Sequence, residues 1–157
     1  MTNIDKSKPV MVTGATGYVA GWVIKRLLDD GITVHAAVRN PDNESKLAHL
    51  NKLAESSKGN IKYFKSDLLE ANSYAEAMKD CELVIHTASP FTTEVKNPQK
   101  ELIEPALNGT ENVLKSVNAT PSVKRVVLTS SCAAIYADAI DCAAAPVGML
   151  TEDIWNE

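Results

Sequence analysis

The chain has 157 residues, of which 45% are hydrophobic and 23% charged, so it has the composition of a globular domain with one sizeable core. The net charge of −4 is spread over interspersed acidic and basic residues, which argues against nucleic-acid and anionic-membrane partners. The polar N-terminus has no signal-peptide core, and no apolar run approaches the roughly 20 residues of a membrane-spanning helix. Three cysteines without metal-ligand spacing indicate free thiols, so we expect a cytoplasmic protein without a metal site.

Short runs of apolar and β-branched residues alternate with segments of helical spacing. The first helical segment ends at Gly31, and its apolar face is expected to carry Val19, Trp22, Val23, Arg26 and Leu27. Pro105 predicts a kink in the last helix. The Ala-rich stretch after Ser131 predicts a surface loop with a short helix at most. The expected strands are 10–13, 32–38, 61–65, 82–87 and 123–129, and the expected helices are 17–30, 44–56, 69–79 and 99–117.

This alternation predicts an α/β fold with a parallel sheet. The strands are nearly continuous apolar runs, as expected when helices cover both faces of the sheet. Each crossover between parallel strands should be right-handed. We therefore expect a Rossmann-type doubly wound sheet with the strand order 3-2-1-4-5. His86, inside the fourth strand, is expected to be a hydrogen-bonded core residue.

The stretch VTGATGYVAG, from Val12 to Gly21, places Gly14, Gly17 and Ala20 between the first strand and the first helix. Glycine permits the sharp turn, the absent side chain at Gly17 allows a pyrophosphate to approach, and a small residue at position 20 allows close packing. The phosphates would then meet free N–H groups at the positive end of the helix. A tight turn without a ligand is the alternative, but the strand–turn–helix context favours a dinucleotide site.

The residue type at the end of the second strand indicates whether NAD or NADP is the expected ligand. An acidic residue there binds the ribose 2′-hydroxyl of NAD, but this chain has Arg39, with Lys46 seven residues later. A guanidinium suits a 2′-phosphate by its charge and its forked donors. The residue pattern favours NADP (NADPH) over NAD, and a solvated loop arginine is the alternative.

Several motifs occur in one order along nearly the whole chain: VTGATGYVAGWVIKRLL, AVRNPDNESK, SDLLE, VIHTASP, NGTENVL and VVLTSSCAAIY. Together they resemble the extended short-chain dehydrogenases, part of the NAD-dependent epimerase/dehydratase superfamily. The branch they resemble contains dihydroflavonol 4-reductase, cinnamoyl-CoA reductase and the yeast methylglyoxal and aldehyde reductases. The resemblance implies an NADP-dependent oxidoreductase that transfers hydride to a small carbonyl substrate.

The resemblance also implies roles for particular residues. Arg39 and Lys46 would contact the 2′-phosphate, and Asp67 and Leu68 the adenine. Ser131 would be the catalytic serine that hydrogen-bonds the substrate carbonyl, although capping at a strand end is the alternative for a serine there. The pyrophosphate would lie against Gly14, Thr16, Gly17, Tyr18 and Val19, and the inner ribose and phosphates above Thr87, Ala88 and Ser89.

The family also uses a Tyr-x-x-x-Lys pair, in which the tyrosine donates a proton and the lysine lowers its pKa. No tyrosine of this sequence has a lysine four residues later. We therefore expect residues 1–131 to form the NAD(P)-binding domain and residues 132–157 to begin the substrate loop region. The chain is expected to be truncated before the substrate-binding half, and to be inactive alone.

Two functions remain open from the sequence. One is the cofactor-binding half of a reductase, and the other is a non-catalytic dinucleotide sensor or interaction module. The expected truncation would leave apolar surface exposed beside the last strand, which favours association, so a homo-oligomer is a candidate assembly.

Overall fold

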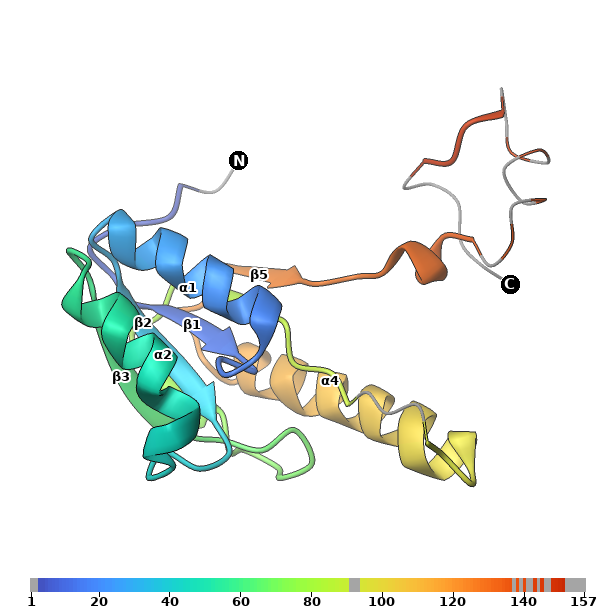
Figure 1. Ribbon diagram of the computed structural model, residues 1–157, viewed down its shortest axis with the longest axis horizontal. Coiled ribbons are helices and arrows are strands. Elements are labelled where there is room, and N and C mark those ends of the chain that lie inside the picture. Colours follow the sequence, from blue (N-terminus) through green and yellow to red (C-terminus); the bar gives the residue numbers. More distant parts are fainter. Residues whose placement is uncertain are drawn as a thin grey trace.

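The computed structural model describes residues 3–90, 94–136, 138, 140, 143, 145 and 148–151. These residues form a five-stranded parallel sheet of order β3-β2-β1-β4-β5, which confirms the predicted topology (Figure 1). The strands are β1 (Val10–Thr13), β2 (Thr33–Val38), β3 (Asn60–Lys65), β4 (Leu83–His86) and β5 (Arg125–Leu128). The helices are α1 (Tyr18–Asp29), α2 (Glu44–Glu55), α3 (Ala75–Met78) and α4 (Glu104–Asn118), with a π-helical turn η1 (Gln99–Ile103) and a 3-10 turn η2 (Cys132–Ala134).

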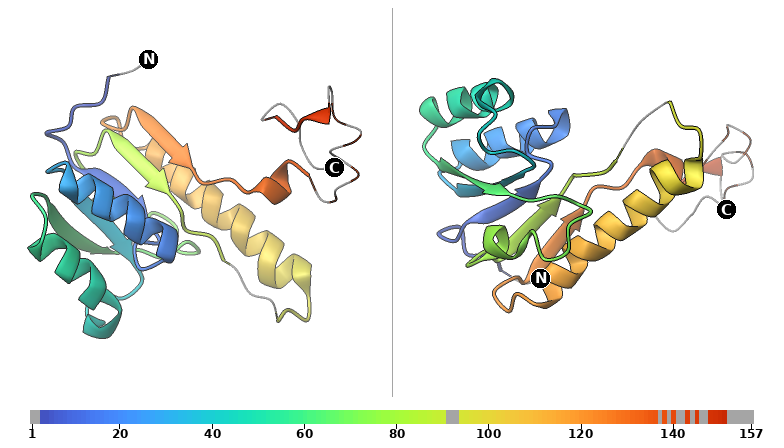
Figure 2. Two further views of the ribbon diagram at one scale, coloured as in Figure 1. Left: turned by 45° about the horizontal axis from the view of Figure 1, so that its top comes forward. Right: turned by 90° about the horizontal axis from the view of Figure 1, so that it is seen from below.

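Two hydrophobic clusters lie on opposite faces of the sheet. Helices α1 and α2 cover one face and α4 the other (Figure 2). Side chains of a strand point alternately to the two faces, so Val10 and Val12 of β1 join the first cluster and Met11 the second. Because both faces of the sheet are covered, both sets of side chains in a central strand are mostly apolar, and β1 lies in the middle of the molecule.

The apolar face of α1 differs from the sequence-based prediction. The buried side chains are Ala20, Ile24 and Leu28, whereas Val19 is 54% and Trp22 60% exposed. Ala20 is small, so this stripe allows the helix to approach the sheet closely. The prediction that Trp22 belongs to the core is therefore wrong.

The third helix is shorter than predicted, since only Ala75–Met78 is α-helical within the expected 69–79. The preceding loop is held by Ser73, whose Oγ donates to Asp67 O at 2.7 Å and accepts from Asp67 N–H at 3.0 Å. Asn72 adopts a positive φ of 62°. Such local side-chain bonds to the backbone compete with helix formation.

The long helix has the predicted extent, but Pro105 lies in the first turn of α4, directly after the π-helical turn. Proline has no N–H to donate, so it is tolerated best at the start of a helix. Apolar side chains exposed on this helix and on β5 include Ile103, Leu107, Val127 and Leu128. Association through this surface stays a prediction.

Candidate functional site

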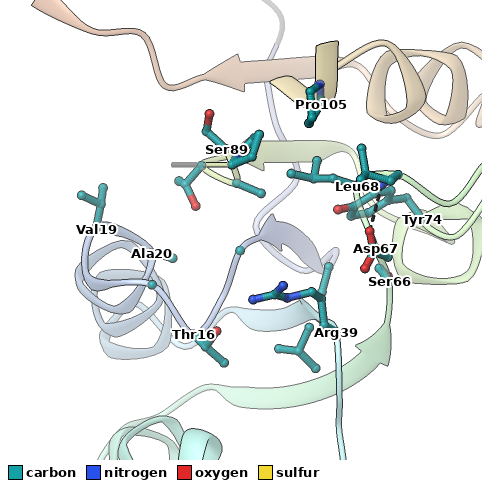
Figure 3. A pocket seen from close by; sticks show the side chains of 18 of the residues that line it. Thr16, Val19, Ala20, Arg39, Ser66, Asp67, Leu68, Tyr74, Ser89 and Pro105 are labelled. Carbon is teal, nitrogen blue, oxygen red and sulfur yellow. Dashed lines mark hydrogen bonds between the residues drawn. The ribbon is translucent and has the colours of Figure 1, made fainter. Parts of the chain in front are cut away.

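A cavity of about 880 Å³ opens at the carboxyl ends of the parallel strands, where open α/β sheets bind their ligands (Figure 3). Its volume lies towards the upper end of the roughly 300–1,000 Å³ typical of small-molecule sites. The sequence-predicted residues that line it are Gly14, Thr16, Gly17, Tyr18, Val19, Arg39, Asp67, Leu68, Thr87, Ala88 and Ser89. The structure thus brings together three separate loops, after β1, β3 and β4, with the end of β2.

The turn after β1 requires glycine. Gly14 has a φ of +62°, and a Cβ atom there would lie 3.0 Å from the Cα atom of Ala88. The N–H of Gly17 donates to Gly14 O at 2.8 Å, which closes the turn. The main chains after β1 and β4 therefore meet at the cavity wall, and any side chain at position 14 would push them apart.

The N-terminus of α1 suits an anion. Gly17 precedes the helix in an extended conformation, offers no side chain to cap it, and the first turn contains no acidic residue. The first N–H groups of a helix have no intrahelical partners, and the helix dipole places partial positive charge there. Because Gly17, Tyr18 and Val19 line the cavity, this end of the helix is available to a phosphate.

A buried network joins the ends of β1 and β4. The Oγ1 atom of Thr13 accepts the N–H groups of Thr87 and Ala88 at 3.1 and 3.0 Å. Its own hydrogen is therefore directed at His86 Nδ1, 2.7 Å away, so Nδ1 acts as an acceptor and the neutral ring carries its proton on Nε2. Burial lowers the pKa of His86, which favours this neutral form.

His86 is thus a hydrogen-bonded core residue, as predicted. The Thr87 hydroxyl completes the network by donating to Thr13 O at 2.6 Å. Thr13 was not predicted as a functional residue: it lies within the VTGATGYVAG stretch, but the glycine spacing assigns no role to this threonine.

Arg39 lines the cavity at the end of β2, and Figure 3 shows its guanidinium extending into the space between Asp67 and the turn that carries Thr16. In the described part of the chain no carboxylate forms an ion pair with it. Lys46 is exposed in the first turn of α2 and does not line the cavity. The structure therefore brings one of the two predicted phosphate-binding cations to the cavity.

The loop after β3 forms the wall beside Arg39. Asp67 Oδ1 accepts the N–H of Leu69 at 2.9 Å, which orients its carboxylate. Tyr74 packs beneath this loop and lines the cavity, and burial together with the charge of Asp67 raises the pKa of its hydroxyl to about 12. Tyr74 therefore stays protonated at neutral pH. Ser66 and Tyr74 also line the cavity, but no role was predicted for them from the sequence: Ser66 begins the SDLLE motif, in which only Asp67 and Leu68 were assigned, and Tyr74 lies in no quoted motif.

Ser131 is not among the residues that line the cavity. It follows β5, and its Oγ accepts the N–H of Ala133 at 3.2 Å, so it caps the turn η2. This is the alternative that the sequence left open for it. A role in catalysis stays a prediction, and the segment 152–157 lies outside the described residues.

A second, smaller cavity of about 410 Å³ lies between α1 and α2, and Trp22, Lys25, His49 and Leu53 contribute to its lining. Trp22 therefore forms part of a surface groove between the helices. Within the described ranges, no group of three or more His, Cys, Asp or Glu side chains is placed to hold a metal ion. No helix in the same ranges is long and apolar enough to cross a bilayer.

A parallel sheet of order 3-2-1-4-5, a glycine turn and an uncapped helix N-terminus are together features of the Rossmann-type α/β fold, in which dinucleotides bind at this edge of the sheet. The chain belongs to the NAD dependent epimerase/dehydratase family, whose model matches residues 10–149. This confirms the family resemblance seen in the sequence.

Curated relatives of the chain are reductases. It is 49% identical over 135 residues to a cinnamoyl-CoA reductase of Medicago truncatula, with 86% of this chain and 41% of the relative covered. It is 46% identical over 155 residues to tetraketide alpha-pyrone reductase 1 of Arabidopsis thaliana, with 98% and 46% covered. The chain therefore spans less than half the length of these relatives.

A solved structure has the same fold. Gre2 of Candida albicans, described in complex with NADPH, has a TM-score of 0.79 and 33% sequence identity to this chain. The alignment covers 96% of this chain and 44% of that one. The relation to reductases is thus seen in both sequence and structure.

Proposed function

We propose that the cavity binds NADPH and that the chain is the cofactor-binding part of an NADP-dependent carbonyl reductase. The observation that carries this proposal is the approach of the Arg39 guanidinium to a cavity that also contains the uncapped N-terminus of α1. The two features offer separate positive sites for a pyrophosphate and for a 2′-phosphate. The NADPH complex described for Gre2 supports the same cofactor.

The chain's residues fit this cofactor in order along the cavity. Gly14 to Val19 would hold the pyrophosphate, because only a glycine fits at position 14 and the helix N–H groups are free there. Arg39 would bind the 2′-phosphate, with Lys46 adding long-range charge from outside the cavity. Asp67 and Leu68 would contact the adenine, and residues 87–89 the inner ribose and phosphates. We assign these roles to residues 1–131 as one domain.

The bound nicotinamide supplies the hydride for reduction of a carbonyl carbon. This chain's part is to bind and orient the cofactor, with Ser131 proposed to hydrogen-bond the carbonyl oxygen. We expect residues 132–157 to belong to the substrate side. Because no tyrosine of the 157 residues has a lysine four positions later, the chain alone should turn over negligibly. The substrate class, drawn from the names of the relatives, is a small carbonyl compound.

The same absence of a Tyr-x-x-x-Lys pair favours one alternative, in which the chain binds the dinucleotide without catalysing a reaction. Both functions require the cavity to bind a dinucleotide, so binding is tested first.

Calorimetric titration of the purified chain with NADPH and then with NADH tests the proposal. We expect NADPH to bind with a clear preference, and the preference to weaken with salt because the 2′-phosphate contact is electrostatic. Equal affinities for the two would contradict the assigned role of Arg39, and no binding of either would contradict the proposed function. A carbonyl reduction assay follows, in which robust turnover by the chain alone would show that a proton donor has been misplaced.

A further inference from the structure

Ser66 has a buried hydroxyl without a partner at the wall of the main cavity. The residue follows β3 and is 4% exposed, and its N–H donates to Val38 O at 2.9 Å. Among the described residues, Ser66 Oγ is the one buried side-chain nitrogen or oxygen atom without a hydrogen bond. Buried polar groups are almost always paired, so an unpaired one at a cavity indicates a missing ligand atom.

The surroundings of Ser66 suit an apolar, planar group. Leu68 and Tyr74 lie beside Ser66 in Figure 3, and Val38, whose carbonyl accepts the Ser66 N–H, also lines the cavity, as does Ala37. Figure 3 shows Ser66 beside Asp67 and Tyr74, on the side of the cavity opposite to Val19 and Ala20. A phosphate dianion is costly to place among apolar side chains, whereas an aromatic base gains from burial there. The cation that suits a phosphate is Arg39, whose side chain is exposed.

We propose that Ser66 is a further specificity-determining residue of the cofactor site, and that its Oγ donates a hydrogen bond to a ring nitrogen of the adenine base. The proposal rests on the dinucleotide-binding function proposed above. It adds a donor to the base site, where the neighbouring Asp67 can act only as an acceptor in its ionised form. The purine would then be recognised by one donor and one acceptor from adjacent residues.

A ligand-binding role and a structural role of Ser66 predict different changes in stability when Ser66 is replaced by alanine. A serine that holds the fold together would lose stability when replaced by alanine. Ser66 makes no side-chain hydrogen bond, so Ser66→Ala removes an unpaired hydroxyl and should leave the cofactor-free protein as stable as before, or more stable. Only the bound state should lose an interaction.

The test compares the 157-residue chain with Ser66→Ala and with a control, Ser116→Ala. Ser116 is also buried, but its Oγ donates to Asn112 O at 3.0 Å within α4, away from the cavity. Affinities for NADPH and NADH are measured by calorimetry, and thermal unfolding is measured without nucleotide. NADH is included because it has the adenosine but lacks the 2′-phosphate.

For Ser66→Ala we expect both affinities to fall by the same factor, about five- to tenfold, with an unchanged or higher unfolding temperature. For Ser116→Ala we expect unchanged affinities and an equal or lower unfolding temperature.

Three results with Ser66→Ala would overturn the assignment: unchanged affinities, a loss confined to NADPH, or a drop in unfolding temperature that accompanies the loss of affinity. A loss confined to NADPH would mean that the hydroxyl binds the 2′-phosphate. A drop in unfolding temperature would mean that the hydroxyl stabilises the fold. If Ser66→Ala binds like the wild type while the wild type binds NADPH, the proposed function stands and this inference fails. If the wild type binds neither nucleotide, both fail.

Discussion

Two strand-to-helix connections lie side by side in this molecule, and they differ in how the N-terminus of the following helix is capped. The turn after β1 leads into α1, and the loop after β2 leads into α2, and both helices pack on the same face of the sheet. The second helix is capped by its own chain: Asn43 Oδ1 accepts the N–H of Lys46 at 3.1 Å, and Glu44 adds an acidic residue to the first turn. The first helix has neither feature.

We interpret this difference as one helix N-terminus that the chain itself stabilises and one that is open to the phosphates of the proposed ligand. A capping side chain accepts a hydrogen bond from one of the unpaired N–H groups of the first turn, and an acidic residue there offsets the helix dipole. The N-terminus of α1 lacks that stabilisation. Its turn is held from the β4 side instead, because His86 and the Ala88 N–H bond to Thr13 at the end of β1 and Ala88 lies against Gly14.

Replacing Gly14 should have the largest effect. In Gly14→Ala the new Cβ would lie 3.0 Å from Ala88 Cα, at a backbone φ that L-residues disfavour. Displacing the turn by even a small distance should weaken NADPH binding by about 100-fold or more, because the phosphate site depends on its geometry. Calorimetry and thermal unfolding measure the two consequences.

Gly31→Ala is the matched control. Gly31 also has a positive φ, +81°, but the nearest atom to an added Cβ is Lys58 Cβ at 3.9 Å. Backbone strain alone should cost roughly 1–2 kcal/mol of stability and leave NADPH affinity unchanged. Equal losses of affinity in the two variants would show that the close approach to Ala88 is not what matters.

Arg39→Ser removes the charge that we assign to the 2′-phosphate. We expect NADPH affinity to fall roughly 10- to 100-fold and NADH affinity to change little, since a hydrogen bond to a charged group is stronger than a neutral one. Calorimetry with both nucleotides measures the change in preference.

Two further variants sharpen this result. Lys46→Ala should change NADPH affinity by at most about fivefold, because its side chain is exposed and outside the cavity lining. Arg26→Ser, near the opposite end of α1 where Arg26 pairs with Asp30, should change neither affinity. A larger loss for Lys46 than for Arg39 would reverse the assignment of the phosphate site.

Lowering the pH should destabilise the protein, in part through His86, which holds the turn after β1 by its hydrogen bond with Thr13. Burial lowers the pKa of His86 and of His35 below the ordinary value of 6.5, so both are neutral in the folded chain and protonate more readily when unfolded. Their contribution to stability is complete above pH 6.5 and is lost as the pH falls through their lowered pKa values.

Denaturant unfolding between pH 7.5 and pH 5 measures this loss. The Asp and Glu side chains with lowered pKa values act below this window, because their ordinary values are 3.8 and 4.5. His86→Asn keeps an acceptor for Thr13 but does not titrate, so its stability should depend less on pH. An unchanged pH dependence would mean that His86 does not contribute.

Removing the cap of α2 should have the smallest effect on the site. Asn43→Ala deletes the acceptor for the Lys46 N–H and should cost about 1 kcal/mol of stability. We expect NADPH affinity to stay unchanged, because the N-terminus of α2 does not line the cavity. A clear loss of affinity would show that the second connection also belongs to the ligand site.

The sequence located most of the cavity because each of its loops follows a recognisable strand. Gly14 and Gly17 carry a known spacing, and Arg39, Asp67 and Thr87 follow the ends of strands that a parallel sheet brings to one edge. Lys46 was placed with Arg39 by resemblance, yet in the structure it points from an exposed helix turn outside the cavity lining. Spacing along the chain could not decide this.

Burial of individual side chains was harder to predict. Trp22 was predicted to lie on the buried face of α1, but this helix has apolar residues on more than one face. The sheet buries the stripe that begins with the small residue Ala20 and continues through Ile24 and Leu28. The length of the helix before β4 was overestimated, because Ser73 forms hydrogen bonds with the backbone of Asp67. Hydrophobic periodicity does not reveal such bonds.

By itself, the sequence determined the fold class, the strand order and the position of the glycine turn, because periodicity and strand-to-helix punctuation are local properties of the chain. Only the tertiary structure decided which polar groups meet. It paired Thr13 with His86 across two strands, left the Ser66 hydroxyl without a partner, and kept Lys46 out of the cavity lining that contains Arg39. Contacts between residues far apart in sequence depend on how the layers pack, and no local pattern encodes them.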